Sequence, residues 1–426
     1  MNNKIDIIGG VRERFGIDWL EKGKGALLLA FVIGVSVLGN IKLYIGSPMV
    51  WLILLAPIFI YSLLCKRLSV AFLMANPFII LIFMGWLIFV SGIALAGWLH
   101  DGKGVYTIIK YLVIMLVLLG CILIQPTERQ LEFSLYAGFV VSFLPLLILM
   151  LTRKHELLVI LGDGRAGWYA AWPGVVWKTA ALIWPMALWS YLNKRNWRCY
   201  LLVASSMLVV SIDGSRTAML WMALTYILFF LVFCLSRHWP GLRPGKHIAL
   251  LSTFLVVFLV LQPSLLSWVN LGGQPALLDV TELSGSTIDR VAAGNTSTRM
   301  EMLYIGWMSA IAEFPFGAGF GQTVALDAGV PTVIHMTYLQ LLADTGVLGL
   351  TGYLAIFVIP LIVVVRFIVN GAGSIHERIG YVLPASSGIL LYLFSGLFHP
   401  VSNELMEWMV VLLSIAVVIT RVPYRN

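Results

Sequence analysis

Residues 72–97, FLMANPFIILIFMGWLIFVSGIALAG, contain no charged side chain. An α-helix rises about 1.5 Å per residue, so roughly 20 apolar residues cross the ~30 Å hydrocarbon core of a bilayer. This stretch is therefore long enough to span a membrane as a helix. Similar stretches recur along the chain, and together they decide the fold class.

The composition of the 426-residue chain agrees with a lipid environment. Hydrophobic residues make up 60% of the chain and charged residues only 11%, with a mean hydropathy of +0.94. A water-soluble domain has too little interior to bury that much apolar side chain. The net charge of +8 does not indicate a nucleic-acid partner, because the basic residues separate apolar runs instead of forming a stripe.

Apolar stretches of about 20 residues predict the transmembrane spans. They lie near residues 26–42, 47–65, 72–97, 105–124, 131–151, 173–193, 199–212, 217–235, 248–266, 346–368, 379–397 and 404–421. The sequence thus predicts an all-α polytopic membrane protein of about 12 transmembrane helices. No cleavable signal peptide is expected, because the first apolar run is long enough to remain as an anchor.

The distribution of basic residues predicts the orientation. Twelve spans place both termini on one side of the membrane, and 18 of the 28 Lys and Arg residues lie in segments on that side. By the positive-inside rule, we expect a bacterial inner-membrane protein with both termini in the cytoplasm. The four cysteines then fall at cytoplasmic span ends, so no periplasmic disulfide is expected. They are Cys65, Cys121, Cys199 and Cys234.

One long segment interrupts the short loops and divides the chain. We expect transmembrane helices one to nine in residues 1–266, a periplasmic loop and catalytic region in residues 267–345, and the last three helices in residues 346–426. The large loop contains an amphipathic pattern, which predicts a helix that lies across the membrane surface or over a cavity mouth. Thr298 and Glu301 have capping-box spacing, which predicts that this helix begins there. The apolar positions are Met300, Leu303, Tyr304, Trp307, Ile311 and Phe314.

Two arginines are candidates for binding an anion. Arg299 directly follows the expected cap of the loop helix, where guanidinium and backbone amides together suit an anion, or where it merely touches Glu301 or lipid headgroups. Arg216 opens the eighth span, next to Asp213-Gly214-Ser215. Asp213 is an obvious partner for it, so the alternative is a simple ion pair at the membrane surface.

His335 is a candidate base, because histidine titrates near neutral pH and can accept a proton from an alcohol; the alternative is a structural histidine. It precedes residues 336–346, which read as a short helix broken at glycine. The sequence contains no Asp-x-Asp, Cys-x-x-Cys, His-Glu-x-x-His or phosphate-binding P-loop motif, which disfavours metal-dependent sugar-nucleotide transferases and ATPases.

These residues resemble motifs of the O-antigen ligase and polymerase superfamily of membrane glycosyltransferases. His335 followed by Gly346-Val347-Leu348-Gly349 resembles its histidine and Gly-x-x-Gly pattern, and Ser215-Arg216 resembles its Ser-Arg at the start of a membrane helix. Arg299, Trp307 and the segment 314–321 resemble its loop of arginine, tryptophan and a Pro- and Gly-rich turn. The resemblance covers roughly residues 200–370, and the first six spans match only in general character.

The resemblance implies an enzyme that transfers a glycan from undecaprenyl pyrophosphate to a hydroxyl group at the periplasmic face. Arg216 and Arg299 would bind the pyrophosphate, and His335 would be the general base of an inverting displacement that needs neither metal nor cofactor. The further candidates for binding substrate are Arg290, Arg165 and Tyr338, although Arg290 suits a surface charge as well. His399 and Glu404 are candidates for orienting another group.

The preferred function is an O-antigen ligase, with lipid A–core as the acceptor and membrane lipids as surroundings. Chain length, span number and one large late loop resemble that subgroup. The nearest alternative is an O-antigen polymerase, which uses the same donor and a second lipid-linked glycan as acceptor. A protein O-oligosaccharyltransferase and a transporter of lipid-linked glycans are the remaining alternatives. The candidate residues gather at one membrane face, which disfavours a transporter with a midplane cavity.

Overall fold

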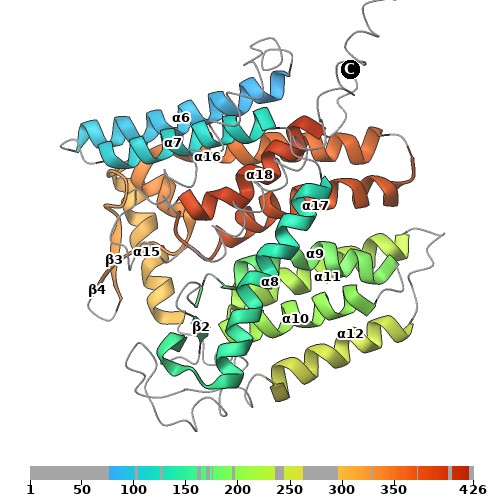
Figure 1. Ribbon diagram of the computed structural model, residues 1–426. Coiled ribbons are helices and arrows are strands. Elements are labelled where there is room, and N and C mark those ends of the chain that lie inside the picture. Colours follow the sequence, from blue (N-terminus) through green and yellow to red (C-terminus); the bar gives the residue numbers. More distant parts are fainter. Residues whose placement is uncertain are drawn as a thin grey trace, which may run out of the picture.

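The computed structural model describes residues 76–100, 104–124, 128–160, 165–168, 173–174, 176–193, 197–235, 244–261, 296–327, 330–371, 373–401 and 405–421. About 83% of the structure is helical, as expected of an all-α protein (Figure 1). The helices are α6 (Pro77–Leu99), α7 (Val105–Ile124), α8 (Glu128–Thr152), η1 (His155–Leu157), α9 (Val176–Asn193), α10 (Trp197–Asp213), α11 (Arg216–Leu235), α12 (Pro244–Val256), η2 (Val257–Leu261), α15 (Thr296–Ala312), α16 (Thr337–Asn370), α17 (Ile375–Ser395) and α18 (Leu405–Arg421).

Two antiparallel hairpins complete the described elements. Strands β1 (Leu158–Ile160) and β2 (Ala166–Trp168) form one, and strands β3 (Val324–Asp327) and β4 (Val330–Val333) form the other. Both hairpins and α15 lie at one end of the long helices, on the left of Figure 1. This end holds the candidate residues discussed below.

The long helices form two groups. In the α16 group, α6 packs against α7 and α16, and α18 packs against α7 and α16. In the α9 group, α9 packs against α10 and α11, and α12 contacts α10. Helix α17 contacts both groups, since it packs against α16, α18 and α9, and α8 contacts α9 and α17. Figure 1 shows the α16 group above the α9 group.

The described helices agree with ten of the twelve expected spans in position, and the first two expected spans lie outside the described residues. Four apolar helices are long enough to cross a bilayer by length and composition. They are Pro77–Leu99, Tyr106–Leu123, Gln130–Thr152 and Thr337–Asn370. The chain is thus an all-α membrane protein, whereas the count of twelve crossings and the orientation stay predictions.

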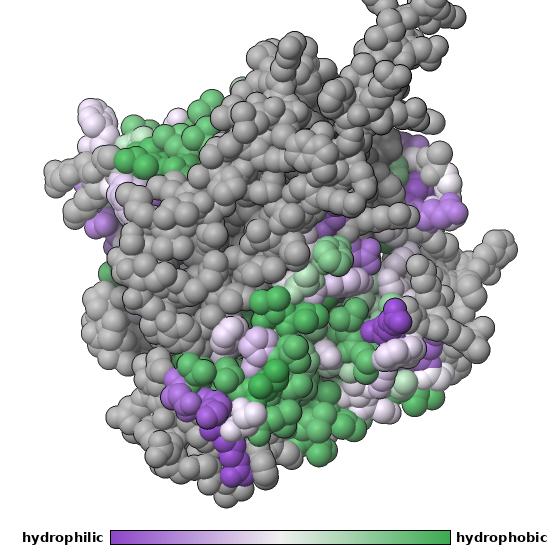
Figure 2. All heavy atoms as spheres, viewed as in Figure 1, coloured by the Kyte–Doolittle hydropathy of each residue, from purple (hydrophilic) through white to green (hydrophobic). Residues whose placement is uncertain are grey.

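The protein surface supports this reading. Apolar side chains cover α8 and the neighbouring α10 and α12 in a broad exposed area (Figure 2). On α8 alone, Phe133, Leu144 and Leu151 are each about half exposed. Soluble proteins rarely expose contiguous apolar surface of this extent, and lipid is the solvent that suits it.

Glycines allow α6 and α16 to pack backbone against backbone. A Cβ atom on Gly92 of α6 would lie 2.4 Å from the backbone nitrogen of Gly349, and one on Gly352 would lie 2.2 Å from the backbone nitrogen of Phe89. Small residues permit such close crossings in membranes, where association depends on dispersion contacts and not on exclusion of water. Gly349, the second glycine of the Gly-x-x-Gly motif, is therefore a packing residue.

Next to this crossing, aromatic side chains fill the centre of the α16 group. Trp86 and Trp408 lie with ring centroids 5.0 Å apart, and both are fully buried. The ring of Tyr353 on α16 packs edge-on against Trp408, and the ring of Phe357 stacks on it. Large rings at one point give α6, α16 and α18 a common buried contact.

Helix α16 changes direction at Gly346, the first glycine of the same motif. Gly346 has φ 65° and ψ −164°, a conformation that other residues strongly disfavour. The segment before it was expected to be a short helix broken at glycine, and this is confirmed. A short helical segment that begins at Thr337 and a longer one after Gly346 meet at this break, and the expected domain boundary between residues 345 and 346 falls here.

Helix α15 is the expected helix of the long loop, but its start differs from the prediction. It begins at Thr296, so Thr298 lies within the first turn and does not cap the helix. Capping-box spacing is a local signal that recurs inside helices, and here it misplaces the start by two residues. Arg299 remains in the first turn or just beyond it, close to the helix N-terminus.

We predict that Gly346→Ala destabilises the fold. A Cβ atom at this position would lie 2.0 Å from the carbonyl oxygen of Pro315, and the positive φ adds backbone strain. The expected loss is more than about 1 kcal/mol, measured as a lower midpoint of thermal unfolding in detergent. Gly245→Ala on α12 is the matched control, because a Cβ atom there meets nothing within 4 Å. Equal midpoints for both variants would contradict the prediction.

Candidate functional site

The turn between α10 and α11 places Arg216 at a helix N-terminus. Gly214 adopts φ 68° and its N–H donates to the carbonyl of Val210, which ends α10. The hydroxyl of Ser215 then accepts from the N–H of Ala218, so Ser215 caps α11. Arg216 follows as the first helical residue. The Ser-Arg pair is thus a cap followed by a cation at the positive end of the helix dipole.

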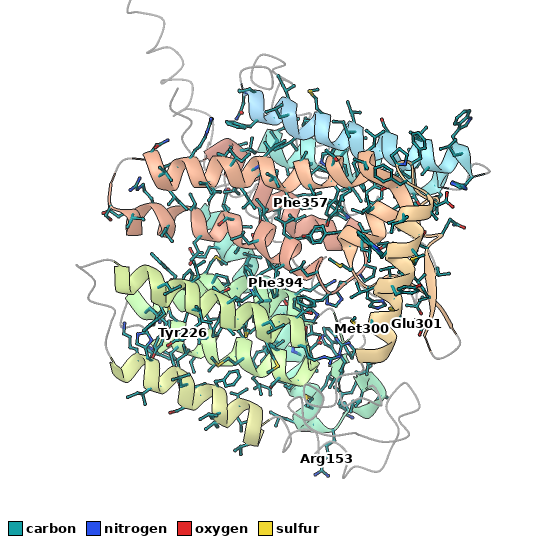
Figure 3. All side chains as sticks on the ribbon, turned by 180° about the vertical axis from the view of Figure 1, so that it is seen from behind. Arg153, Tyr226, Met300, Glu301, Phe357 and Phe394 are labelled. Carbon is teal, nitrogen blue, oxygen red and sulfur yellow. The ribbon has the colours of Figure 1, made fainter. Side chains whose placement is uncertain are left out.

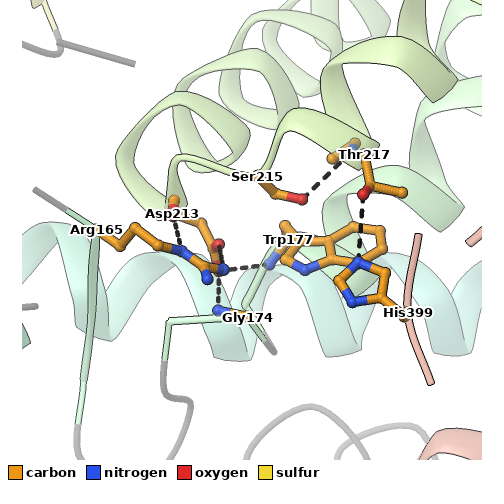
Figure 4. Close-up of polar contacts among 8 residues, drawn as sticks. Arg165, Gly174, Trp177, Asp213, Ser215, Thr217 and His399 are labelled. Carbon is orange, nitrogen blue, oxygen red and sulfur yellow. Dashed lines mark hydrogen bonds and ion pairs between the residues drawn. The ribbon is translucent and has the colours of Figure 1, made fainter. Parts of the chain in front are cut away.

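Asp213, directly before this turn, binds a different arginine from the one expected. Its fully buried carboxylate pairs with the guanidinium of Arg165 at 2.9 Å, and Arg165 also donates to the Asp213 carbonyl (Figure 4). The carboxylate of Asp213 thus has a partner, Arg165, that the sequence analysis did not consider for it. Figure 4 shows Arg165 reaching Asp213 from the loop that precedes α9.

The same carboxylate also caps α9. One of its oxygens accepts from the backbone N–H groups of Gly174 and Trp177, at 2.8 and 3.3 Å. A buried carboxylate is costly unless paired and hydrogen-bonded, and Asp213 obtains both from Arg165 and the N-terminus of α9. The contacts give Arg165 a structural role, and its role in binding substrate stays a prediction.

Arg299 and Arg216 lie close enough for their charges to interact. The exclusion of water by the surrounding protein and the charge of Arg216 both lower the pKa of Arg299. The two guanidinium groups carry the same charge, so each raises the positive potential at the other. Each residue also stands near the N-terminus of its own helix, where backbone amides favour an anion. Together they form an electropositive site suited to phosphate groups.

His335 adopts the tautomer that a general base needs. Its Nδ1 lies 3.0 Å from the carbonyl oxygen of Val333, two residues earlier in β4. A carbonyl oxygen only accepts, so Nδ1 carries the proton and Nε2 presents the lone pair of the neutral ring. The side chain is half-buried. His335 lies in the short link between β4 and α16, and its hydrogen bond to the backbone gives the ring a defined orientation.

Packing holds His335 beside α15. Ile334 is fully buried in a small apolar cluster with Met302 of α15 and Ala325 of β3, and Met336 packs against it. Met302 lies three residues after Arg299, on the same side of the helix. Both neighbours of His335 are therefore anchored to the helix that carries Arg299. Met336 stands where the resembled family has a polar residue, and it makes no side-chain hydrogen bond to the start of α16.

His399 connects the start of α11 to the start of α16. Its Nε2 lies 3.2 Å from the hydroxyl of Thr217, the residue after Arg216. Its carbonyl accepts from the hydroxyl of Thr337 at 2.8 Å, and its ring stacks on Trp177 (Figure 4). The sequence did not predict the contact between His399 and Thr217. That His399 orients another group stays a prediction. Glu404, named with it, lies outside the described residues.

The remaining site candidates from the sequence have different outcomes. Tyr338 donates its hydroxyl to the carbonyl of Leu393, which ties α16 to α17, and its role in binding substrate stays a prediction. Arg290 lies outside the described residues. Within the described ranges, no three His, Cys, Asp or Glu side chains are arranged to hold a metal ion. Whether the reaction needs a metal stays a matter of prediction.

Asp344 is an important residue that the sequence reasoning missed. Its carboxylate is fully buried and accepts from the backbone N–H groups of Gly321 and Thr323, at 2.8 and 3.0 Å, and from Gln340 at 3.3 Å. Gly317 of the same Pro- and Gly-rich loop packs on the backbone of α16, where a Cβ atom would meet Asp344 at 2.5 Å. Two motifs of the resembled family are thus bound directly to each other. The sequence did offer a signal for Asp344: it is an acidic residue within the apolar stretch between His335 and Gly346.

A scan against protein-family models finds no match, and a search of curated proteins finds none. The function therefore has to be inferred from the geometry of the site. Arg216, Arg299, His335 and His399 are gathered at one end of the helices, and Asp213 and Asp344 fix the turns around them.

We predict that Asp344→Asn destabilises the loop of residues 314–321. One carboxylate oxygen becomes an amide nitrogen, so a backbone N–H loses its acceptor in a buried place. The expected loss is about 1–3 kcal/mol, measured by thermal unfolding in detergent. Glu313→Gln is the control, because its side chain is exposed and its contact with His100 is long, at 3.7 Å. Unchanged stability of Asp344→Asn would show that this carboxylate does not hold the loop.

Proposed function

We propose that this chain is a membrane glycosyltransferase that moves a glycan from undecaprenyl pyrophosphate to an acceptor hydroxyl at the periplasmic face. The observation that carries the proposal is that the charge of Arg216 acts on Arg299, while each residue lies near the N-terminus of a different helix. Two guanidinium groups whose charges act on each other suit a multiply charged anion, and pyrophosphate has that charge. The resemblance of the surrounding motifs selects a lipid-linked glycan as the molecule that carries it.

The chemistry is a single displacement. The acceptor oxygen attacks the anomeric carbon of the donor sugar, and its proton passes to Nε2 of His335. The bond between that carbon and the pyrophosphate oxygen breaks, and the electron pair leaves on the pyrophosphate. Arg216 and Arg299 stabilise the charge that develops there. Attack opposite the leaving group inverts the anomeric centre, and pyrophosphate is a good enough leaving group to need no protonation.

Within this class, the proposal is an O-antigen ligase of the bacterial inner membrane, with twelve spans, both termini in the cytoplasm and lipid A–core as the acceptor. The single long loop before α16 and the placement of the candidate residues at one end of the helices favour it over a transporter. A transporter would be expected to place its charged residues near the middle of the membrane. A polymerase would share the donor site and differ in the acceptor.

Variants of the three candidate residues should separate donor binding from transfer. Arg216→Lys and Arg299→Lys lose the planar fork and should each lower kcat/KM about 10²-fold, with weaker binding of undecaprenyl pyrophosphate. His335→Gln should lower kcat about 10²–10⁴-fold and leave that binding unchanged. The measurements are transfer in proteoliposomes with purified donor and acceptor, and donor binding by native mass spectrometry.

Arg198→Lys is the matched control for the arginine variants. Arg198 lies over the ring of Trp197 at 5.9 Å, at the start of α10 and far along that helix from the Asp213 turn. Its replacement should change neither binding nor transfer. Transfer at the parental rate by all three site variants would overturn the proposed mechanism.

A bacterium that lacks only this gene should distinguish ligase from polymerase. For a ligase, lipopolysaccharide gels should show core without polymer, while long polymer accumulates on the lipid carrier. Core that bears a single repeat would instead identify a polymerase. An unchanged ladder would contradict both and direct the search to protein acceptors or transport.

A further inference from the structure

Helix α15 presents an apolar face to its surroundings. Its exposed side chains recur at intervals of three and four residues and so share one side of the helix. We call this set the outer stripe; it consists of Met300, Tyr304, Trp307, Met308 and Ile311, each between 48% and 65% exposed. Contiguous exposed side chains of this size on an otherwise packed helix indicate a contact that the described chain does not itself provide.

The opposite side of α15 is occupied by the protein. Met302 and Ala310 are buried, and Met302 belongs to the apolar cluster with Ile334. A Cβ atom on Gly306 would lie 3.0 Å from the side chain of Leu339, so the helix sits close to the start of α16. The orientation of α15 is therefore fixed by packing, and the outer stripe faces away from this contact.

The outer stripe leads to the exposed end of a membrane-spanning helix. Past the end of α15, Phe314 and Phe316 are 67% and 47% exposed. The next residue, Gly317, accepts a hydrogen bond at its carbonyl from His100, at the end of α6. Trp98, two residues before His100, is the most exposed large apolar side chain described, at 77%. The segment that follows α15 thus contacts the end of a span, and both carry exposed apolar side chains.

The direction of α15 suits a membrane surface. In Figures 1 and 3, α15 runs across the direction of α6 and α16, at their ends, and Figure 3 marks its N-terminal part with Met300 and Glu301. A helix that crosses the ends of spans lies along the membrane plane. Tyr304 and Trp307 combine an apolar ring with a polar tip, as do residues enriched at the boundary between headgroups and acyl chains.

We propose that α15 rests in the boundary between lipid headgroups and acyl chains, with the outer stripe directed into the lipid. The apolar side chains enter the acyl region, and the Tyr304 hydroxyl and Trp307 indole N–H remain at the polar level. One consequence rests on the proposed function: Arg299, at the N-terminal end of this helix, is held at headgroup level. There the pyrophosphate of a membrane-anchored donor meets it without leaving the bilayer surface.

The test measures the surroundings of single nitroxide labels in proteoliposomes of phosphatidylethanolamine and phosphatidylglycerol. Tyr304→Cys and Ile311→Cys carry the label in full-length protein whose four native cysteines are replaced by alanine. Collision rates with oxygen, which concentrates in lipid, are compared with those of a water-soluble nickel chelate. Leu87→Cys on the exposed side of α6 is the lipid reference, and Lys154→Cys in the exposed loop after α8 is the water reference.

Both labels on α15 should show an oxygen-to-nickel ratio several-fold above that of Lys154→Cys and below that of Leu87→Cys. A ratio equal to that of Lys154→Cys would place the outer stripe in water and overturn the proposal. Low collision rates with both reagents would show that protein covers the stripe, such as a second copy of the chain, and would overturn it as well. The measurement uses neither donor nor acceptor, so its outcome is independent of whether the chain is a transferase.

Discussion

The buried carboxylate of Asp344 is the contact on which this end of the α16 group depends. Its acceptors are used by backbone N–H groups of the loop before β3, so the loop is fixed to α16 by hydrogen bonds that water cannot replace at that depth. The change of direction at Gly346 brings the carbonyl of Pro315 against α16, where the N–H of Val347 donates to it at 3.0 Å. These contacts position helix α15, the hairpin β3–β4 and His335.

Asp213 has the corresponding role in the α9 group, and its choice of partner matters for the site. Arg165 and the N-terminus of α9 together compensate its charge. Asp213 and Asp344 thus fix the turns next to the candidate residues through buried hydrogen bonds.

The sequence predicts well those features that repeat locally. The expected span 105–124 coincides with α7, and Ser215-Arg216 was placed correctly at the start of a membrane helix, since apolar length and cap residues are local signals. Contacts between distant segments could not be predicted in this way. Arg165 lies 48 residues from Asp213, and Thr217 lies 182 residues from His399. No spacing rule links such pairs, so the sequence suggested only a neighbouring residue, Arg216, as a partner for Asp213.

The two arginines belong to different groups of helices, so their spacing depends on how the groups sit. Arg299 and His335 belong to segments packed on one another beside α16, whereas Arg216 belongs to the α9 group. A small displacement of one helix group relative to the other would alter the spacing of the guanidinium groups and leave the base aligned with α15. In the proposed transferase, the spacing of the groups that bind the anion would thus be adjustable, while the position of the proton acceptor is fixed by packing. This difference would allow the spent, still charged carrier to be released without disturbing the geometry needed for the next turnover.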